Sequence, residues 1–202
     1  MNQTSFQNPT PGQRLESGIR KRWRRFWDGL LLYLTNHIVS RCLFPQLRLA
    51  WYRRVMKFDI APGASVLTDC RFSGRGNLAV GGNTVINNEC RLDNREPIRI
   101  GSNVSISYGA LILTAGHNLD SSRFSYRGAS VVIEDYVWVC ARATVQPGVT
   151  LGRGSVALAG SVVAHTVPPM HVVGGVPARF VKERKSELTY RLHWNPAVPP
   201  LG

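Results

Sequence analysis

Two hydrophobic periods divide this chain of 202 residues near residue 58. Up to that point apolar residues recur every three or four positions, which is the spacing of one helix face. From Ile60 onward large apolar residues recur every six positions. Neither an α-helix, with its period of 3.6, nor a strand, with its period of 2, produces a six-residue spacing. The chain is therefore expected to combine two architectures.

The first segment is predicted to hold an amphipathic helix over residues 15–40. Its apolar stripe comprises Ile19, Trp23, Phe26, Trp27, Leu30, Leu34 and Ile38. Basic residues occupy the other faces, at Arg20, Lys21, Arg22, Arg24 and Arg25. Pro45 interrupts the pattern, and a second short helix is expected over residues 46–56.

The six-residue period predicts a parallel β-helix, in which each repeat forms one short side and one corner. The large apolar positions are Ile60, Val66, Phe72, Val80, Ile86, Leu92, Ile100, Ile106, Ile112, Ile133, Val139, Val145, Leu151, Ala157 and Val163. They are expected to fill the interior, and a small residue four positions later lets the chain round the corner. Cys70 and Cys90 stand at small positions and are expected in the core. Two slips of two residues, near 77–79 and 96–99, are interpreted as local bulges.

One long insertion interrupts the repeat. From Ile112 to Ile133 there are 21 residues, which is one repeat plus 15. A polar loop of that length in a compact fold is usually functional. Residues 113–132 are therefore predicted to form a functional loop, with His117 at its root.

The charge of the chain is uneven. Of the net +13, residues 1–57 contribute +9, because they hold 11 basic and 2 acidic residues. Such a basic segment favours an anionic partner. Two alternatives stay open for residues 14–57: peripheral contact with an anionic membrane, or packing of the apolar stripe on the β-helix of the same or a neighbouring subunit. No nucleic acid partner is expected.

Composition bounds the cellular setting. The longest apolar run of the first helix, Leu30–Leu34, is far shorter than the roughly 20 residues that a membrane span needs. Four cysteines without metal-like spacing, in a chain without a cleavable signal, favour a reducing compartment. The expected location is cytoplasmic, with membrane contact as the open alternative above.

Several motifs follow one another in a characteristic order. They are Thr114-Ala115-Gly116-His117, Val137-Trp138-Val139-Cys140-Ala141-Arg142-Ala143, Pro147-Gly148-Val149-Thr150-Leu151-Gly152, Ala159-Gly160-Ser161-Val162-Val163, Val167-Pro168-Pro169 and Gly174-Gly175-Val176-Pro177-Ala178-Arg179. In these motifs the chain resembles the hexapeptide-repeat acyltransferases, in particular the maltose and galactoside O-acetyltransferase branch. The basic N-terminal segment and residues 187–192 resemble members that acetylate cell-surface polysaccharides.

The resemblance implies an all-β fold, a left-handed parallel β-helix that assembles as a homotrimer with active sites between subunits. It divides the chain into a basic helical segment (1–57), the acyltransferase domain (58–183) and a C-terminal tail (184–202). The co-substrate it implies is acetyl-CoA, lying along the coil, and no metal is required. His117 and Asn87 match the family's catalytic residues. By the same resemblance Trp138, Ala141 and Ala159 contact the pantetheine arm, and Arg179 and Lys182 lie near the nucleotide phosphates.

The residue types suit this chemistry. A hydroxyl becomes nucleophilic when a base takes its proton, and an imidazole with an ordinary pKa of about 6.5 is such a base near neutral pH. A backbone N–H near Ala141 would hold the oxyanion that forms. The chain departs from the family at two positions, His165 in place of a lysine and Cys140 in place of a glycine, and both bear on CoA affinity.

The function predicted from these observations is O-acetylation of a sugar or glycan, in cell-surface polysaccharide biosynthesis. An antibiotic acetyltransferase and an amino-sugar N-acyltransferase stay open as alternatives, as does a non-catalytic β-helix scaffold. A zinc hydratase on the same fold would need three histidines around one metal. The middle of the predicted β-helix holds only His117, because His165 and His171 lie at its far end.

Overall fold

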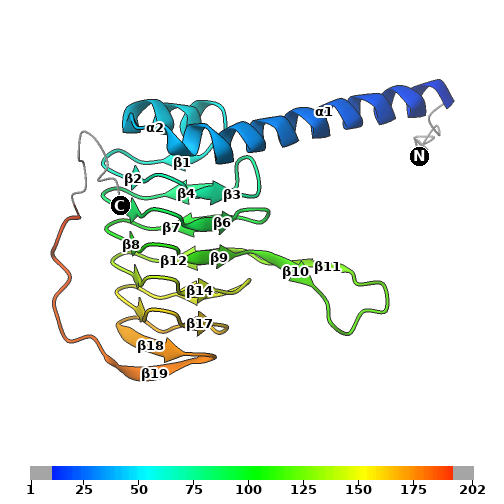
Figure 1. Ribbon diagram of the computed structural model, residues 1–202. Helices are drawn as coiled ribbons and strands as arrows, with labels where there is room; N and C mark the ends of the chain where they lie inside the picture. The colour runs from blue at the N-terminus through cyan, green and yellow to red at the C-terminus, as the bar shows by residue number, and fades with distance from the viewer. Residues whose placement is uncertain (1–10, 193–202) are drawn as a thin grey trace, which may run out of the picture.

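The computed structural model describes residues 11–192, with side chains in the first helix from Arg20 onward. It forms a parallel β-helix whose N-terminal end is capped by helices (Figure 1). The helices are α1 (Pro11–His37), the 3-10 helix η1 (Val39–Arg41) and α2 (Pro45–Arg54). Both predicted helices are therefore confirmed, with ends shifted by a few residues.

Three sheets form the sides of the β-helix, and one circuit through all three is called a coil here. Sheet A contains β1 (Asp59–Ile60), β4 (Leu78–Val80), β7 (Ile98–Ile100), β12 (Val131–Ile133) and β15 (Thr150–Leu151). Sheet B contains β2 (Ser65–Val66), β5 (Val85–Ile86), β8 (Ser105–Ile106), β13 (Trp138–Val139), β16 (Val156–Ala157), β18 (His171–Gly175) and β19 (Ala178–Glu183). Sheet C contains β3 (Arg71–Phe72), β6 (Arg91–Asp93), β9 (Leu111–Leu113), β14 (Thr144–Val145) and β17 (Val162–Val163). All neighbours in these sheets are parallel except β18 and β19.

The core consists of the residues that the six-residue period predicts. Each of the fifteen large apolar positions is no more than 5% exposed. The strand register stacks equivalent positions, such as Val66, Ile86 and Ile106, directly on one another. Cys70 and Cys90 are fully buried among them. Each such apolar side chain contributes about 1.5–3 kcal/mol by leaving water, and the predicted β-helix is confirmed.

The corners impose their own requirements on the sequence. The corner between sheets A and B passes through one left-handed residue in each coil, for example Asn83 (φ 56°), Asn103 (φ 55°) and Gly154 (φ 69°). Asn and Gly adopt this conformation at low cost. Close stacking adds a second requirement at Gly81, where a Cβ atom would lie 2.5 Å from the carbonyl carbon of Gly101 in the next coil. Only glycine fits there.

The two slips in the repeat fall at the corner between sheets C and A. The strands on either side keep an unbroken register, so the expectation of bulges is wrong. The extra residues form longer corner loops, and the first is held by the Asn94 side chain, which accepts from the N–H groups of Ser73 and Gly74. In the third coil the same corner carries the long insertion. This corner tolerates added residues because the strands after it re-enter the register, as β12 does on β7.

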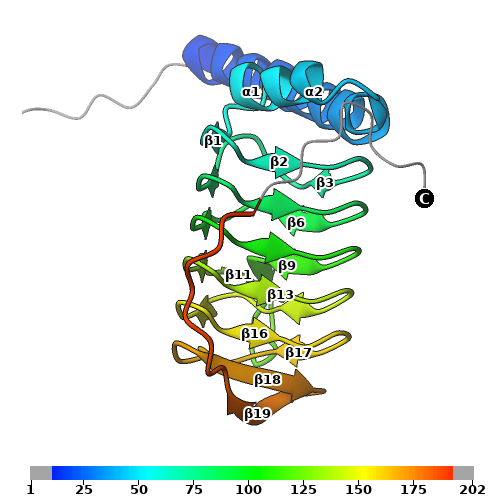
Figure 2. The ribbon, with the colours of Figure 1, turned by 90° about the vertical axis from the view of Figure 1, so that its left-hand side faces the viewer.

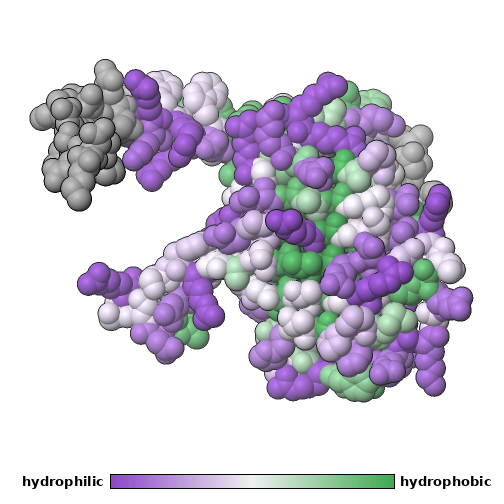
Figure 3. All heavy atoms as spheres, turned by 180° about the vertical axis from the view of Figure 1, so that it is seen from behind, coloured by the Kyte–Doolittle hydropathy of each residue, from purple (hydrophilic) through white to green (hydrophobic). Residues whose placement is uncertain are grey.

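The insertion forms an antiparallel hairpin of β10 (Ala115–His117) and β11 (Tyr126–Gly128). It projects from the body on the same side as the free end of α1 (Figure 1). Both projections extend from one side of a body on which an apolar band runs between more hydrophilic surfaces (Figure 3). The predicted loop is thus a protruding arm that places His117 outside the coil.

The helical cap is fixed by polar contacts. The Asn36 side chain exchanges two hydrogen bonds with the backbone of Phe72 in β3. Arg48 is fully buried and donates to the carbonyl oxygens of Cys42 and Val66, with no carboxylate beside it in the described chain. Leu32 packs against the core of the coil. The cap therefore contacts the β-helix through one face of α1 and through Arg48 of α2.

The predicted apolar stripe lies on the opposite side of α1. With 3.6 residues per turn, Trp23 and Trp27 point away from the face that carries Leu32 and Asn36. Trp23, Phe26 and Trp27 are 59%, 59% and 52% exposed. Trp23, Phe26 and Trp27 of the stripe therefore do not pack on the β-helix of their own subunit.

The C-terminal tail returns along the corner between sheets A and B (Figure 2). Arg184 donates to the carbonyl oxygen of Tyr136, the Tyr190 ring meets the Tyr136 ring edge-on at 5.2 Å, and the N–H of Leu192 donates to Asn103. The remainder of the predicted tail, residues 193–202, lies outside the described residues. Within 11–192, no helix combines the length and hydrophobicity that crossing a bilayer requires.

Candidate active site

His117 lies at the end of β10, paired with Tyr126 of β11, and is exposed. Its Nδ1 atom is 2.9 Å from the carbonyl oxygen of Phe124. The His117 and Phe124 rings are stacked, with centroids 3.9 Å apart and planes inclined by 13°. One residue of the hairpin tip therefore fixes both the position and the rotation of the imidazole.

This contact also selects the tautomer of His117. A carbonyl oxygen only accepts hydrogen bonds, so Nδ1 of the imidazole must carry the proton. In the neutral ring the lone pair then resides on Nε2, which points away from Phe124. A histidine held in this way presents a base at Nε2 to whatever lies in front of it.

Buried contacts hold the root of the hairpin. Thr114 is fully buried, donates to the carbonyl oxygen of Asp93 and accepts from the N–H of Glu96 at 2.9 Å. The Tyr126 hydroxyl donates to the Glu96 carboxylate at 2.8 Å, and this hydrogen bond raises the pKa of Tyr126. The partner residue of His117 is thus tied to the coil.

Phe124, Tyr126 and Glu96 are site residues that sequence analysis missed. Two aromatic residues in an otherwise polar loop were the available signal. Their roles depend on the hairpin register and on the left-handed conformation of Phe124 (φ 49°), neither of which the repeat pattern specifies.

The residues predicted for the pantetheine arm gather on sheet B and at its corner with sheet C. Trp138 is 46% exposed and donates from Nε1 to the Ser107 hydroxyl at 2.9 Å. Ala141 and Ala159 follow β13 and β16 at this corner, linked by the N–H of Gly160 donating to the Ala141 carbonyl oxygen. The N–H of Ala141 has no acceptor among residues 11–192. It is therefore available to a ligand.

Arg179 and Lys182 lie on β19, at the far edge of the same sheet. The register places Lys182 three strands below Trp138, by way of Val156 and Val172. Three strand spacings amount to about 14 Å, so Trp138 and Lys182 lie on one line down sheet B, with Ala141 and Ala159 beside it at the corner with sheet C. Arg179 also borders a cavity of about 240 Å³ at the end of the coil, together with His165 and His171. The histidine that replaces the family's lysine thus stays beside Arg179.

Asn87 lies at the corner between sheets B and C, two coils above Ala141. Its Oδ1 accepts from the N–H of Asn88 at 2.9 Å, and its Nδ2 faces no acceptor in the described chain. His117 instead leaves the coil at the corner between sheets C and A, which is opposite sheet B (Figures 1 and 2). A single chain does not bring His117 together with Asn87 or Trp138.

Other reactive groups do not form a competing site. Burial raises the pKa of the Cys140 thiol, which disfavours a thiolate there. The cysteines at 42, 70, 90 and 140 are all free. Across residues 11–192 no three His, Cys, Asp or Glu side chains converge in a way that would hold a metal ion.

Known proteins with this fold resemble the chain in sequence as well. A solved hexapeptide-repeat acetyltransferase from Vibrio cholerae, complexed with acetyl coenzyme A, is 31% identical and superimposes with a TM-score of 0.69 over 78% of this chain and 85% of that one. This chain belongs to the hexapeptide-repeat acetyltransferases. No family model matches it.

Two of the curated proteins similar to this chain come from Escherichia coli. Galactoside O-acetyltransferase is 30% identical over 118 residues, which is 55% of this chain and 57% of the relative. Chloramphenicol acetyltransferase is 33% identical over 116 residues, 47% of this chain and 55% of the relative. The chain thus spans little more than half the length of these two curated relatives.

Proposed function

We propose that this protein transfers the acetyl group of acetyl-CoA to a hydroxyl of a sugar. The observation that carries the proposal is the hydrogen bond from His117 Nδ1 to the Phe124 carbonyl oxygen, because it leaves Nε2 free as a base. The family and the acetyl-CoA complex of the Vibrio cholerae relative support the same chemistry.

Each group of the site has a separate role in the proposed reaction. His117 Nε2 accepts the proton of the acceptor hydroxyl, whose oxygen forms a bond to the thioester carbon. The N–H of Ala141 donates to the oxyanion that develops there. When the carbon–sulfur bond breaks, the imidazolium returns its proton to the departing CoA sulfur. Acetyl ester and CoA thiol are the products, and no covalent enzyme intermediate is needed.

The acceptor is proposed to be a sugar hydroxyl, in a glycan of the cell surface. The galactoside O-acetyltransferase relative supports a sugar, and the chloramphenicol acetyltransferase relative keeps an antibiotic hydroxyl as the second candidate. A panel of neutral, acidic and amino sugars with chloramphenicol, incubated with acetyl-CoA and followed by mass spectrometry, tests the proposal. An O-acetylated sugar is the expected product. Acetylation of chloramphenicol alone, of amines alone, or of none would overturn it.

The active unit is proposed to be a homotrimer. The line of residues on sheet B and the His117 hairpin face different sides of one subunit, so each pocket would be completed by a hairpin from the next subunit. Cyclic assembly satisfies this need three times with a single kind of contact. Light scattering is expected to give the mass of a trimer, and an active monomer would rule this assembly out.

The exposed face of α1 is proposed to bind an anionic membrane surface. Trp23, Phe26 and Trp27 are exposed on the side opposite the coil, and helix geometry places arginines at both edges of that stripe. An aromatic stripe bordered by cations suits the headgroup region of a bilayer, where each basic residue contributes about 1 kcal/mol. The enzyme would then work beside lipid-linked glycan precursors at the cytoplasmic face.

A further inference from the structure

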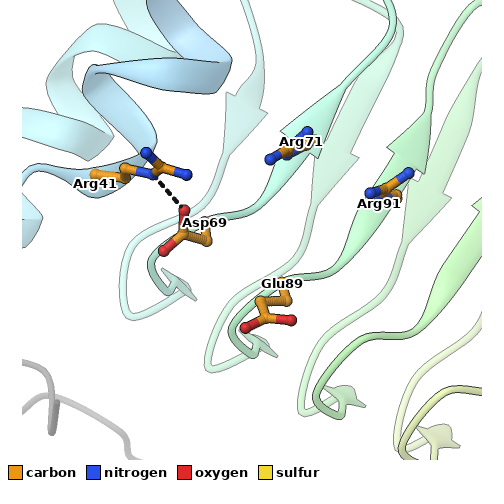
Figure 4. Close-up of a pocket in the computed structure, with 5 residues that line it drawn as sticks. All are labelled: Arg41, Asp69, Arg71, Glu89 and Arg91. Atoms are coloured by element: carbon orange, nitrogen blue, oxygen red, sulfur yellow. Dashed lines mark hydrogen bonds and ion pairs between the residues drawn. The ribbon is translucent and has the colours of Figure 1, made fainter. Parts of the chain in front are cut away.

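A second cavity, of about 250 Å³, lies on the outer surface of the first two coils. Arg71 of β3 and Arg91 of β6 line it from sheet C, Asp69 and Glu89 line it from the corner with sheet B, and Arg41 of η1 closes one end. Figure 4 shows the two strand arginines side by side above the two corner carboxylates. Five charged side chains thus converge on one space.

The carboxylates of this cavity are already engaged. Arg41 Nε lies 2.7 Å from Asp69 Oδ1, and the Tyr108 hydroxyl donates to Glu89 Oε2 at 2.8 Å. The nearest acidic residue along β6, Asp93, is held by two hydrogen bonds of 2.7 Å from Arg95. Partial burial raises the pKa of Asp93, but the Arg95 contacts outweigh it and the pKa lies below its usual range.

Arg71 and Arg91 face each other without such a partner. They are register neighbours on parallel strands, which places their backbones about 4.8 Å apart. Neither makes an ion pair with any acidic side chain of the described chain. Like charges directly opposite on adjacent strands destabilise a sheet. An anion between the two guanidinium groups would relieve this repulsion.

The position of the cavity connects it to the proposed reaction. Glu89 follows Asn87 by two residues at the same corner, and Tyr108, which binds Glu89, is next to Ser107, which binds Trp138. The cavity therefore lies at the corner between sheets B and C, beyond the Trp138 end of the line of residues proposed for acetyl-CoA. A group bound there lies beyond the acetyl end of that line, where an acceptor belongs.

We infer that Arg71 and Arg91 bind an anionic substituent of the acceptor, so that the preferred acceptor is a sugar bearing a carboxylate or a phosphate. Guanidinium groups match both anions with paired N–H donors. That the bound anionic sugar is the acceptor of the acetyl group rests on the proposed function. The anion site itself does not, because binding is measurable without turnover.

Isothermal titration calorimetry on the full chain tests the site with three probes: glucuronate, glucose 6-phosphate and glucose. At least one anionic sugar is expected to bind more tightly than glucose, and the comparison of the two distinguishes carboxylate from phosphate. Arg71→Gln and Arg91→Gln should each weaken anionic binding about 10–100-fold. Arg99→Gln, on the outer face of sheet A and away from the cavity, is the matched control and should not change it.

Several results would overturn the inference. Equal affinity for all three probes would do so, as would an equal loss with Arg99→Gln, which would indicate nonspecific attraction. Dissociation of the assembly by Arg71→Gln would assign the arginines to acidic groups of a neighbouring copy. If Arg71→Gln weakened the binding of CoA but not of dephospho-CoA, the two arginines would be assigned to binding the cofactor. Anionic sugars that bind, in a protein that acetylates no sugar of the panel, would leave this site standing and reject the proposed function.

Discussion

The Nδ1 atom of His117 lies 2.9 Å from the carbonyl oxygen of Phe124, while the Phe124 ring stacks on the imidazole at 3.9 Å. One residue therefore controls both which nitrogen is basic and where that nitrogen points. The backbone carbonyl remains when Phe124 is replaced by leucine, so the two contributions are separable by mutation.

Removal of the base is the first prediction. His117→Ala is expected to lower kcat about 10²–10⁴-fold, the usual contribution of a general base, while acetyl-CoA still binds in calorimetry. His37→Ala, an exposed histidine on α1, is the control and should keep wild-type turnover. Near-normal turnover by His117→Ala would exclude it as the base.

Loss of the stacking ring is the second prediction. Phe124→Leu keeps the carbonyl but removes an aromatic contact of about 0.5–1.5 kcal/mol. The expected result is a roughly 2–10-fold lower kcat, with an unchanged KM for acetyl-CoA. Leu119→Ala, at a 93% exposed position in the same hairpin, should have no effect. Equal kinetics for both variants would show that the ring does not position His117.

The third prediction concerns the pocket shared between subunits. Co-expression of His117→Ala with Ala141→Trp, which would fill the proposed pantetheine path, should restore activity that each variant lacks alone. Random assembly of a cyclic trimer from equal amounts leaves about one site in four intact. Turnover near a quarter of the wild-type value is therefore expected. No recovery in verified mixed trimers would place both residues in one subunit's pocket.

Membrane contact through α1 is the fourth prediction. In co-sedimentation, the protein should bind vesicles containing anionic lipid, release as salt rises, and ignore neutral vesicles. Replacement of Trp23, Phe26 and Trp27 together by Ser should abolish binding, and Arg22→Gln with Arg24→Gln should weaken it. Lys185→Gln, in the C-terminal tail, is the control for charge.

The competing occupant of this face is a neighbouring subunit. In that case the triple Ser variant would lose its trimeric mass in light scattering, and the wild-type protein would not bind vesicles of either composition. Those two results together would reject the membrane proposal.

Close stacking of the coils gives the fifth prediction. Gly81→Ala places a Cβ atom 2.5 Å from the carbonyl carbon of Gly101, and backbone atoms of the next coil cannot move independently. Overpacking of this kind costs about 1–3 kcal/mol, or a fall in Tm of about 2–12 °C for a chain of this size. Gly29→Ala in α1, where nothing lies within 4 Å of the new atom, should leave Tm unchanged or raise it. Equal Tm values for the two variants would contradict the stacking argument.

The sequence alone was sufficient for the β-helix because its core is a one-dimensional pattern. Ile86 and Ile106 occupy equivalent positions of the repeat, and both are therefore buried. Each coil packs in the same way as the previous one. The insertion and its histidine were also visible, since a break in a strict period identifies its own boundaries. The helices followed from their apolar spacing.

The orientation of α1 could not be read from that spacing. An apolar stripe predicts only that some surface covers it. Leu32 and Asn36, on the opposite face, make the contacts with the coil instead. Asn36 exchanges two hydrogen bonds with the backbone of Phe72, and no periodicity encodes them. The corner loops were likewise misread as bulges, because a count of residues does not say whether the extra ones lie within a strand or between strands.

The sequence by itself determined the coil and its interior, and it identified His117 as the candidate base. Only the tertiary structure determined which nitrogen of His117 is basic, which side of α1 is free, and that Arg71 and Arg91 meet across one cavity. Those relationships join residues 7 to 36 positions apart through hairpin register, helix rotation and strand stacking. Such distances are set by the packing of whole elements, and a repeat pattern specifies only which residues face inward.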